Sequence, residues 1–362
     1  SSDPNILVQL SFIGVLFNAI TYSCIFLTTI LLPFVGMRLL LSGATIMISV
    51  GFVLSGQATH VWHLYLSFSL CIGIGASIIY GAIIHVIPQW FVKNRSTVFG
   101  LHASAISLPG LFIPFLITYT VNILGITWMY RILALLFFVT NTTAVLLIKE
   151  RPATLAQSNK KQGLNLHTGI LKNKSLLLWT LIGPVTGWGF YIVFAFLPTY
   201  ATHIGLSGYI GSATVTLFSS GGLIGRITIG FVADRLGNLN TYILVTSITA
   251  VLIFVNWMLA FSMPALYTFA FLTGFFCGAP FVLGSPITLA IVGMENYAAA
   301  TSFRMLAYVF IIIGPVVATA LEGISQTPFL ALKVFSGMAY ILSIVIALIV
   351  RLRTSQLLVK KV

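Results

Sequence analysis

The sequence predicts an all-α membrane protein made of two helical bundles with about eleven transmembrane helices. Hydrophobic residues make up 59% of the 362 residues and charged residues 6%, whereas roughly a quarter of an ordinary soluble domain is charged. Apolar runs long enough to cross a bilayer core of about 30 Å recur along the whole chain. Water is therefore not the main solvent of this protein.

A window of about 19 residues detects eleven candidate spans. In chain order these cover residues 6–32, 39–55, 64–87, 96–119, 126–148, 176–200, 210–232, 242–261, 265–292, 297–321 and 329–350. The long hydrophilic connector after the fifth span has no apolar period, which is typical of a linker. The sequence therefore predicts an N-terminal bundle over 1–148, a cytoplasmic linker over 149–174, a C-terminal bundle over 175–351 and a cytoplasmic tail over 352–362.

The two halves share a pattern in which a Gly-rich span leads through a polar loop to a span rich in small residues and proline. Its three parts are residues 71–75, 89–95 and 104–114 in the first half, and residues 273–278, 293–304 and 314–315 in the second. Internal repeats of this kind build the midplane binding site of secondary transporters. The pattern therefore favours a carrier.

Orientation follows from the short loops, because Lys and Arg are enriched on the cytoplasmic side. One side holds Arg38, Lys93, Arg95, the cations of 149–174, Arg235 and those of the tail, whereas the other holds little more than Arg131 and Lys333. The C-terminus is therefore expected in the cytoplasm and, with an odd number of spans, the N-terminus outside.

Composition and motifs argue against several function classes. The formal charge is +13, but the cations lie at the ends of apolar segments and are not interleaved with aromatics, so a nucleic-acid partner is not expected. The three cysteines lie in apolar runs without metal-binding spacing, so no metal or other cofactor is expected. HExxH, GxSxG and GxxxxGK[ST] motifs are absent from the sequence, and five acidic residues leave little for acid–base catalysis. An enzyme is not expected.

The most informative stretch covers residues 221–237. Arg226 lies near the middle of an apolar, glycine-rich span, where a charge is costly and indicates a function. Its guanidinium could hold a planar anion through two parallel hydrogen bonds, or it could be capped by backbone carbonyls or snorkel to the membrane surface. Asp234 and Arg235 close the span at a turn that ends in Gly237. They could form a gate or a solvated turn with a weak surface ion pair.

The run from Gly225 to Gly237 resembles the loop between helices eight and nine of the major facilitator superfamily, and more narrowly its fungal monocarboxylate-transporter-like branch (the monocarboxylate porters). Supporting matches are Gln89-Trp-Phe-Val-Lys-Asn-Arg95 with Gly100-Leu-His-Ala-Ser104, Trp128-Met-Tyr-Arg131, and Gly284-Ser-Pro286 followed by Glu295. The resemblance implies two bundles that move a solute by alternating access.

The resemblance also implies roles for individual residues. Arg226, Gly222 and Arg131 are expected to contact the substrate. The expected gating residues are Asp234, Arg235, Gly225, Gly230 and Arg38. His85, His102 and Glu295 are candidate proton carriers, although a buried histidine with a backbone partner and a hydrated loop carboxylate are the structural alternatives.

The sequence departs from the family pattern in three places. Residue 6 aligns with the start of the family's second helix, so the first helix is expected to be absent. The loop around Gly36 and Arg38 has no carboxylate to pair across the cytoplasmic face. In animal members an aspartate precedes the helix-eight arginine by one turn, whereas this chain has Gly222.

The predicted function is therefore secondary transport of a small organic solute, a monocarboxylate or another organic anion, by symport or facilitated diffusion. The expected partners are this solute, a proton and the lipid bilayer, with the plasma membrane favoured over the vacuolar membrane. Two alternatives stay open: a facilitator of a riboflavin-like solute, and a truncated or sensing protein that does not transport. The substrate, the direction of transport and the oligomeric state are not set by the sequence.

Overall fold

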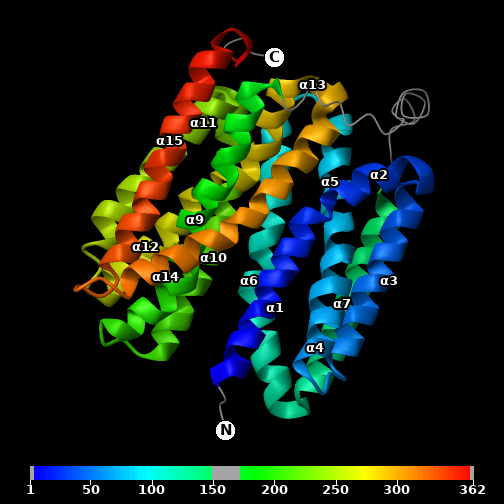
Figure 1. Cartoon of the computed structure of the whole chain (residues 1–362), viewed down its shortest axis with the longest axis vertical. Coiled ribbons are helices and arrows are strands. Elements are labelled where there is room, and N and C mark those ends of the chain that lie inside the picture. The colour runs from blue at the N-terminus through cyan, green and yellow to red at the C-terminus, as the bar shows by residue number, and fades with distance from the viewer. Residues whose placement is uncertain (1–3, 149–171, 359–362) are drawn as a thin grey trace. The chain divides into compact units, whose positions relative to one another are not determined.

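The computed structural model describes residues 4–148 and 172–358, and the regular elements in these two stretches are all helices (Figure 1). The first stretch contains α1 (Pro4–Ser23), α2 (Ile25–Val35), α3 (Met37–Ser55), α4 (Val61–Leu64), η1 (Tyr65–Ile72), α5 (Gly73–Trp90), α6 (Arg95–Leu124) and α7 (Ile126–Leu147). The second contains α9 (Lys174–His203), α10 (Gly208–Leu236), α11 (Asn238–Val251), η3 (Leu252–Trp257), α12 (Met263–Phe276), α13 (Ala279–Ala307), η4 (Tyr308–Ile312), α14 (Ile313–Glu322) and α15 (Leu330–Leu358). The predicted all-α fold class is confirmed.

The described helices include nine that are long and apolar enough to cross a membrane, or ten if the bent pair α1 and α2 is counted as one span. The sequence predicts eleven because it divides the run Met263–Glu322 near residue 293. That run has 60 residues, or about 90 Å of helix at 1.5 Å per residue, which is about three times the bilayer core. Within it, Gly293 has the non-helical angles φ 73° and ψ 174°. The run is therefore too long for one crossing.

The first predicted span is not one straight helix. Its segments Phe12–Ser23 and Ile25–Val35 are bent by 46°. Just before the bend, the Thr21 hydroxyl donates to the Phe17 carbonyl at 2.8 Å, and hydroxyl bonds of this kind to the preceding turn bend helices. Length and hydropathy, which predict the span, do not report whether its helix is straight.

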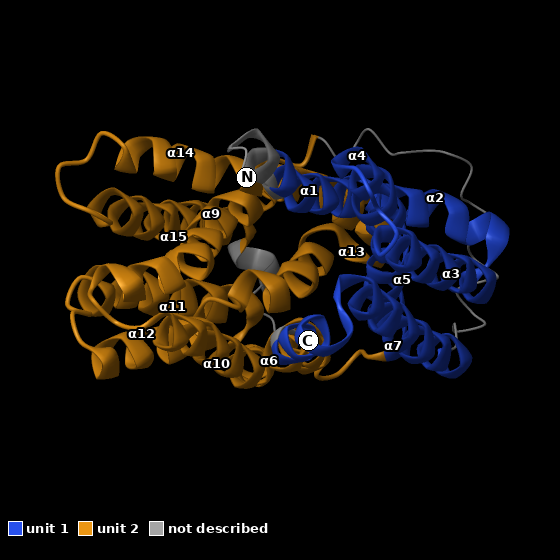
Figure 2. Cartoon of the chain, turned by 90° about the horizontal axis from the view of Figure 1, so that it is seen from below, with its two compact units in different colours: residues 1–90, 114–168 blue, residues 91–113, 169–362 orange. Residues whose placement is uncertain are grey.

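The chain divides into two compact units (Figure 2). The first comprises Ser1–Trp90 and Pro114–Thr168, and the second comprises Phe91–Ile113 and Gly169–Val362. The first part of α6 therefore belongs to the second unit. The predicted linker, residues 149–174, lies mostly outside the described residues, and the predicted tail lies partly outside them. The predicted division into two bundles stays a prediction.

In the first unit, α3 packs against α5 and α7. Met37, Leu41, Ala82 and Val86 form a buried cluster between α3 and α5. Phe52 stacks on Phe137 of α7 with a ring-centroid distance of 5.2 Å.

The second unit has a larger core, and Figure 1 shows α9 and α15 within it as long helices in green and red. Trp257 is fully buried and stacks on Phe269 at 5.3 Å. A buried triad of hydroxyls from Thr186, Tyr242 and Ser343 joins α9, α11 and α15 at 2.7–2.8 Å. Paired hydroxyls of this kind hold helices together where water is excluded.

Candidate functional site

Four residues form a stripe along one face of α10: Gly222, Arg226, Gly230 and Asp234. They recur every fourth residue, and residues four apart lie on the same side of a helix. This α10 stripe packs on the first part of α6, which belongs to the same unit. A methyl group added at Gly222 would lie 2.9 Å from the hydroxyl oxygen of Ser107, and one added at Gly230 would clash with the Ser96 carbonyl. Small residues and charged residues therefore alternate along the contact.

Arg226 is buried, with 4% of its surface exposed. Its Nη1 donates to the Ala103 carbonyl at 3.0 Å and to the Ser107 hydroxyl at 2.5 Å. Its guanidinium carbon lies 5.4 Å from the centre of the Phe281 ring. The absence of a side chain at Gly278 makes room for its stem, since an added methyl would lie 2.8 Å from its Cγ. In this conformation a backbone carbonyl accepts one of the hydrogen bonds of Arg226. A cap of this kind is one of the alternatives that the sequence left open.

Asp234, on α10, caps the N-terminus of the neighbouring helix α6. Its Oδ1 accepts the N–H of Ser96 at 3.0 Å, and its Oδ2 accepts the N–H and the hydroxyl of Thr97 at 2.8 and 2.6 Å. The first N–H groups of a helix have no partner inside it and carry partial positive charge. A carboxylate at this position makes charge-assisted hydrogen bonds. Asp234 therefore holds the end of α10 to the start of α6.

The hydroxyl of Ser96 adds a bond to the same junction by donating to Asn238 Oδ1 at 2.5 Å. Asn238 begins α11, immediately after Gly237, whose φ of 91° ends α10. The turn after α10 therefore contributes to the same contact with α6.

Glycines bring the α10 backbone close to two neighbouring helices. Added methyl groups at Gly221 and Gly225 would clash with the backbone of Phe271 and Phe275 on α12, and one at Gly100 of α6 would clash with the Arg226 carbonyl. Close backbone approach through small residues is the usual packing of membrane helices. The predicted gating residue Gly225 thus lies in the contact between α10 and α12.

Three predicted arginines lie outside this contact between α10 and α6. Arg235 is exposed on α10, with its guanidinium carbon 4.1 Å from the Phe231 ring centre. Arg38 and Arg131 are exposed residues of the first unit, and Arg131 lies 4.9 Å over the Trp128 ring. The structure therefore joins only Gly222, Arg226, Gly230 and Asp234 of the predicted set into one contact. The roles assigned to the three arginines stay predictions.

The candidate proton carriers are dispersed. His85 is 5% exposed on α5 of the first unit. His102 is partly buried on α6, next to the Ala103 that binds Arg226. Glu295 is exposed, two residues after the break at Gly293. A role in proton transfer stays a prediction for each of them.

Sequence analysis missed two other buried cations of the second unit. Arg304 is 2% exposed, and its Nη1 donates to the Tyr308 hydroxyl at 3.1 Å. Lys333 is 5% exposed, and its Nζ donates to the Tyr200 hydroxyl at 2.9 Å and lies 5.9 Å from the Trp257 ring centre. The signal that singled out Arg226, a cation inside a predicted apolar span, was present for both.

Residues 7–251 match the family described as Major Facilitator Superfamily. An MFS-type transporter of Gibberella moniliformis is 25% identical over 304 residues, which is 83% of this chain and 72% of that protein. The agnestins efflux protein AgnL12 of Paecilomyces divaricatus is 27% identical over 348 residues, which is 95% of this chain and 78% of that protein.

The crystal structure of the human organic anion transporter MFSD10 matches with a TM-score of 0.73, over 92% of this chain and 82% of that one. The sequences are 14% identical, so this likeness concerns the fold. Together with the apolar helices, these matches identify a multi-pass integral membrane protein that carries small solutes and is not an enzyme. Over more than half of its length the chain matches one family, and it belongs to the Major Facilitator Superfamily.

Proposed function

We propose that this secondary transporter moves a small organic anion of the monocarboxylate class, and that Arg226 binds its carboxylate. The observation that carries the proposal is the burial of a guanidinium in an apolar unit, with Nη1 bonded to the neutral oxygens of Ala103 and Ser107. A buried cation gains from exchanging neutral ligands such as these for an anion, because opposite charges attract strongly where water is excluded.

The carboxylates of the described residues support this proposal. They belong to Asp234, Glu295 and Glu322. Asp234 lies two turns from Arg226, about 12 Å along α10, and its oxygens accept bonds from α6. Glu322 accepts from the N–H of Phe329, and Glu295 is exposed. In the proposal, the carboxylate of the solute is the anion that Arg226 binds.

The gate in this proposal is the contact between the α10 stripe and α6. The Ala103 carbonyl and the Ser107 hydroxyl hold Arg226 in the closed contact, and Asp234 holds the N-terminus of α6. Separation of the two helices would release the guanidinium to the solute. Arg235 and Arg38 would stabilise neighbouring helix ends on the same cytoplasmic side, and Arg131 would contribute to the outer entrance.

Proton coupling, if this branch of the family uses it here, cannot come from residue 222, which is glycine. His102 is the candidate nearest in sequence to the Arg226 ligands. A facilitator without coupling is the simpler mechanism.

We further propose a plasma-membrane location with the C-terminus in the cytoplasm, in agreement with the distribution of Lys and Arg. The relative named as an efflux protein supports outward transport.

Counterflow in proteoliposomes tests the proposal independently of protein orientation. Proteoliposomes that contain the full chain are loaded with unlabelled lactate, pyruvate, acetate or riboflavin. Entry of the same compound in labelled form is then followed at two pH values. We expect counterflow of a monocarboxylate that Arg226→Gln abolishes and Arg226→Lys weakens, because an ammonium lacks the two parallel donors of a guanidinium. Arg351→Gln, which removes an exposed arginine of α15, is the matched control.

Counterflow of riboflavin alone, or monocarboxylate counterflow unchanged by Arg226→Gln, would contradict the proposal. A higher rate at acid pH would show that protonation of the solute, or of a group other than residue 222, favours the exchange.

A further inference from the structure

The long helical run of the second unit that ends at Glu322 is interrupted at η4. This element is a short stretch of 3-10 helix, and Gly314 and Pro315 follow it at the start of α14. A 3-10 stretch inside a longer helix often marks a hinge, and a proline has no N–H to bond with the preceding turn. The chain can therefore bend between α13 and α14.

The η4 segment itself is fixed on α9. Methyl groups added at Gly183 and Gly187 of α9 would each lie 2.6 Å from the side chain of Tyr308 or Ile311, respectively. Both of these η4 side chains are buried. They therefore fill the hollows that the two glycines leave, and tight packing of this kind resists movement. A bend at this place would pivot on η4.

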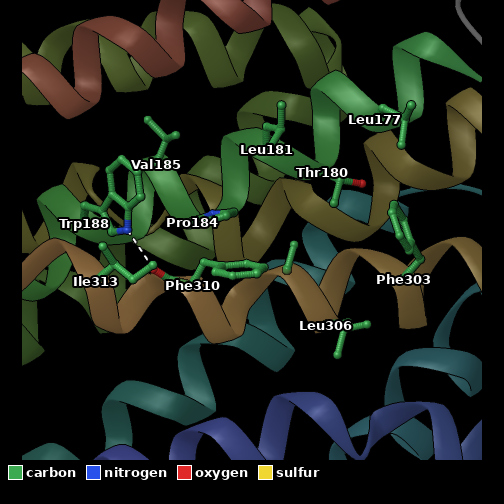
Figure 3. Close-up of a pocket in the computed structure, with 11 residues that line it drawn as sticks. Leu177, Thr180, Leu181, Pro184, Val185, Trp188, Phe303, Leu306, Phe310 and Ile313 are labelled. Atoms are coloured by element: carbon green, nitrogen blue, oxygen red, sulfur yellow. Dashed lines mark hydrogen bonds between the residues drawn. The ribbon is translucent and has the colours of Figure 1, made fainter. Parts of the chain in front are cut away.

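Trp188 of α9 holds the start of α14 in the reverse sense. A methyl group added at Gly314 would clash with its indole ring. The indole N–H donates to the Phe310 carbonyl at 2.9 Å, as the dashed line in Figure 3 shows. A carbonyl at an interruption needs such a partner where water is excluded. Trp188 thus closes the break from outside the interrupted helix.

Beyond the pivot, α14 is packed loosely. Of its ten residues, only Gly314 and Ala318 are buried. Val316, Val317 and Leu321 are exposed. Segments with few buried contacts open at a low free energy. The structure therefore allows α14 to move while η4 stays in place.

The far end of α14 is fastened by one carboxylate. Glu322 is the last residue of α14, and it accepts the N–H of Phe329, just before α15. Phe329 has a φ of 63°, which is unusual and strained for a bulky residue. Its ring lies against Tyr200 and His203 of α9, with centroid distances of 5.2 and 5.0 Å. The bond to Glu322 and the ring contacts hold the strained turn in place.

Opening of this end would have both losses and gains. The hydrogen bonds at Phe329 and Trp188 would be lost. The strain at Phe329 would be relieved, and water would reach Glu322 Oε2, which has no hydrogen-bond partner among the described residues. A buried oxygen without a partner is unfavourable. Opposing contributions of this kind are what a two-state element needs.

We propose that α14 is a gate of the second unit, which swings about η4 and is latched at its far end by Glu322. In the orientation proposed above, this α14 gate lies on the outer side, whereas Asp234 lies on the cytoplasmic side. The inference goes beyond the anion transport proposed above, because it involves neither Arg226 nor a solute. The motion is therefore measured without any transported compound.

The test is hydrogen exchange of the full chain in lipid nanodiscs. Glu322→Ala removes the latch, and Trp188→Phe keeps a ring near Gly314 but loses the N–H donor. If α14 moves as one body, a change at either end should accelerate exchange at the other. We expect Trp188→Phe to accelerate exchange of residues 323–329, and Glu322→Ala that of residues 313–318. Each effect should be about tenfold, the equivalent of about 1.4 kcal/mol.

Three further variants complete the design. Glu322→Gln, which keeps an acceptor oxygen, should give a smaller acceleration than Glu322→Ala. Ser325→Ala removes a hydroxyl bond to the Thr327 carbonyl inside the loop, so it should leave residues 313–318 unchanged. Trp128→Phe, at an exposed tryptophan of the first unit, should change neither segment.

Two results would overturn the proposal. Effects confined to the end that carries the substitution would mean that α14 frays at each end separately. Equal acceleration throughout α9 and α15 would mean that the whole unit opens and that α14 does not move on its own.

Discussion

The carboxylate of Asp234 accepts both the backbone N–H and the hydroxyl of Thr97, at 2.8 and 2.6 Å, so that the end of one helix caps the start of another. Caps normally come from the residue just before the helix, whereas this one comes from a residue that lies more than a hundred positions later in the chain. The α6 N-terminus therefore depends on α10 for its stability.

Asp234→Asn should loosen the first turn of α6. The amide keeps an acceptor oxygen but loses the charge and one acceptor site, and loss of a cap costs about 1 kcal/mol, or about fivefold in local opening. Hydrogen exchange of the peptide that contains Ser96 and Thr97 should accelerate by this factor. Asn240→Ala, which removes an exposed amide that donates to the Leu236 carbonyl, should leave that peptide unchanged. Equal protection in both variants would contradict the cap.

Ser107→Ala should tighten binding of the transported anion, if Arg226 exchanges Ser107 for the solute. A typical hydrogen bond contributes about 0.5–1.5 kcal/mol, which corresponds to a decrease of about twofold to tenfold in the dissociation constant. The measurement is binding of the labelled anion to purified protein. Ser104→Ala is the matched control, because the Ser104 hydroxyl donates to Leu101 on the same helix. Weaker binding in Ser107→Ala would mean that the hydroxyl assists the solute instead.

Gly225→Ala should destabilise the second unit, because the added methyl would clash with the Phe275 backbone on α12. Overpacking of this kind costs about 1–3 kcal/mol, which thermal unfolding followed by tryptophan fluorescence would detect. Gly208→Ala is the control on the same helix, since nothing lies within 4 Å of a methyl group at that position. Similar unfolding temperatures for the two variants would show that α10 and α12 can move apart without loss of stability.

Tyr200→Phe should destabilise the protein because it leaves the buried Lys333 ammonium without its hydroxyl acceptor. Hydrogen bonds to charged groups contribute about 1.5–3 kcal/mol. The same substitution should cost less in a Lys333→Met background, where only the bond from Tyr200 to the Ala260 carbonyl is lost. A double-mutant cycle on the unfolding free energy measures the difference, and additive effects would rule out coupling between the two side chains.

The sequence predicts the helices well but not their contacts. Hydropathy locates α3 and α7 to within two residues, and a charge inside an apolar span identifies Arg226. Its ligands, Ala103 and Ser107, are ordinary residues of a distant helix, and no local pattern marks them as partners. The bend between α1 and α2 is missed because length and hydropathy do not report bends, and Lys333 is missed because it was counted with the loop cations although it lies inside the last predicted span.

Two glycines with positive φ interrupt helices of the second unit, and the two buried arginines can be placed relative to them. Non-helical backbone is tolerated in a membrane protein only where water or protein satisfies it, so Gly237 and Gly293, with φ of 91° and 73°, mark levels where the helices are interrupted. Arg226 lies eleven residues before the first, and Arg304 lies eleven residues after the second. At 1.5 Å per residue, the Cα atoms of both arginines lie about 16 Å along the helix from an interruption, a distance that is about half of a bilayer core of about 30 Å. The second unit therefore carries two buried arginines, each eleven residues from a point where its helices are interrupted.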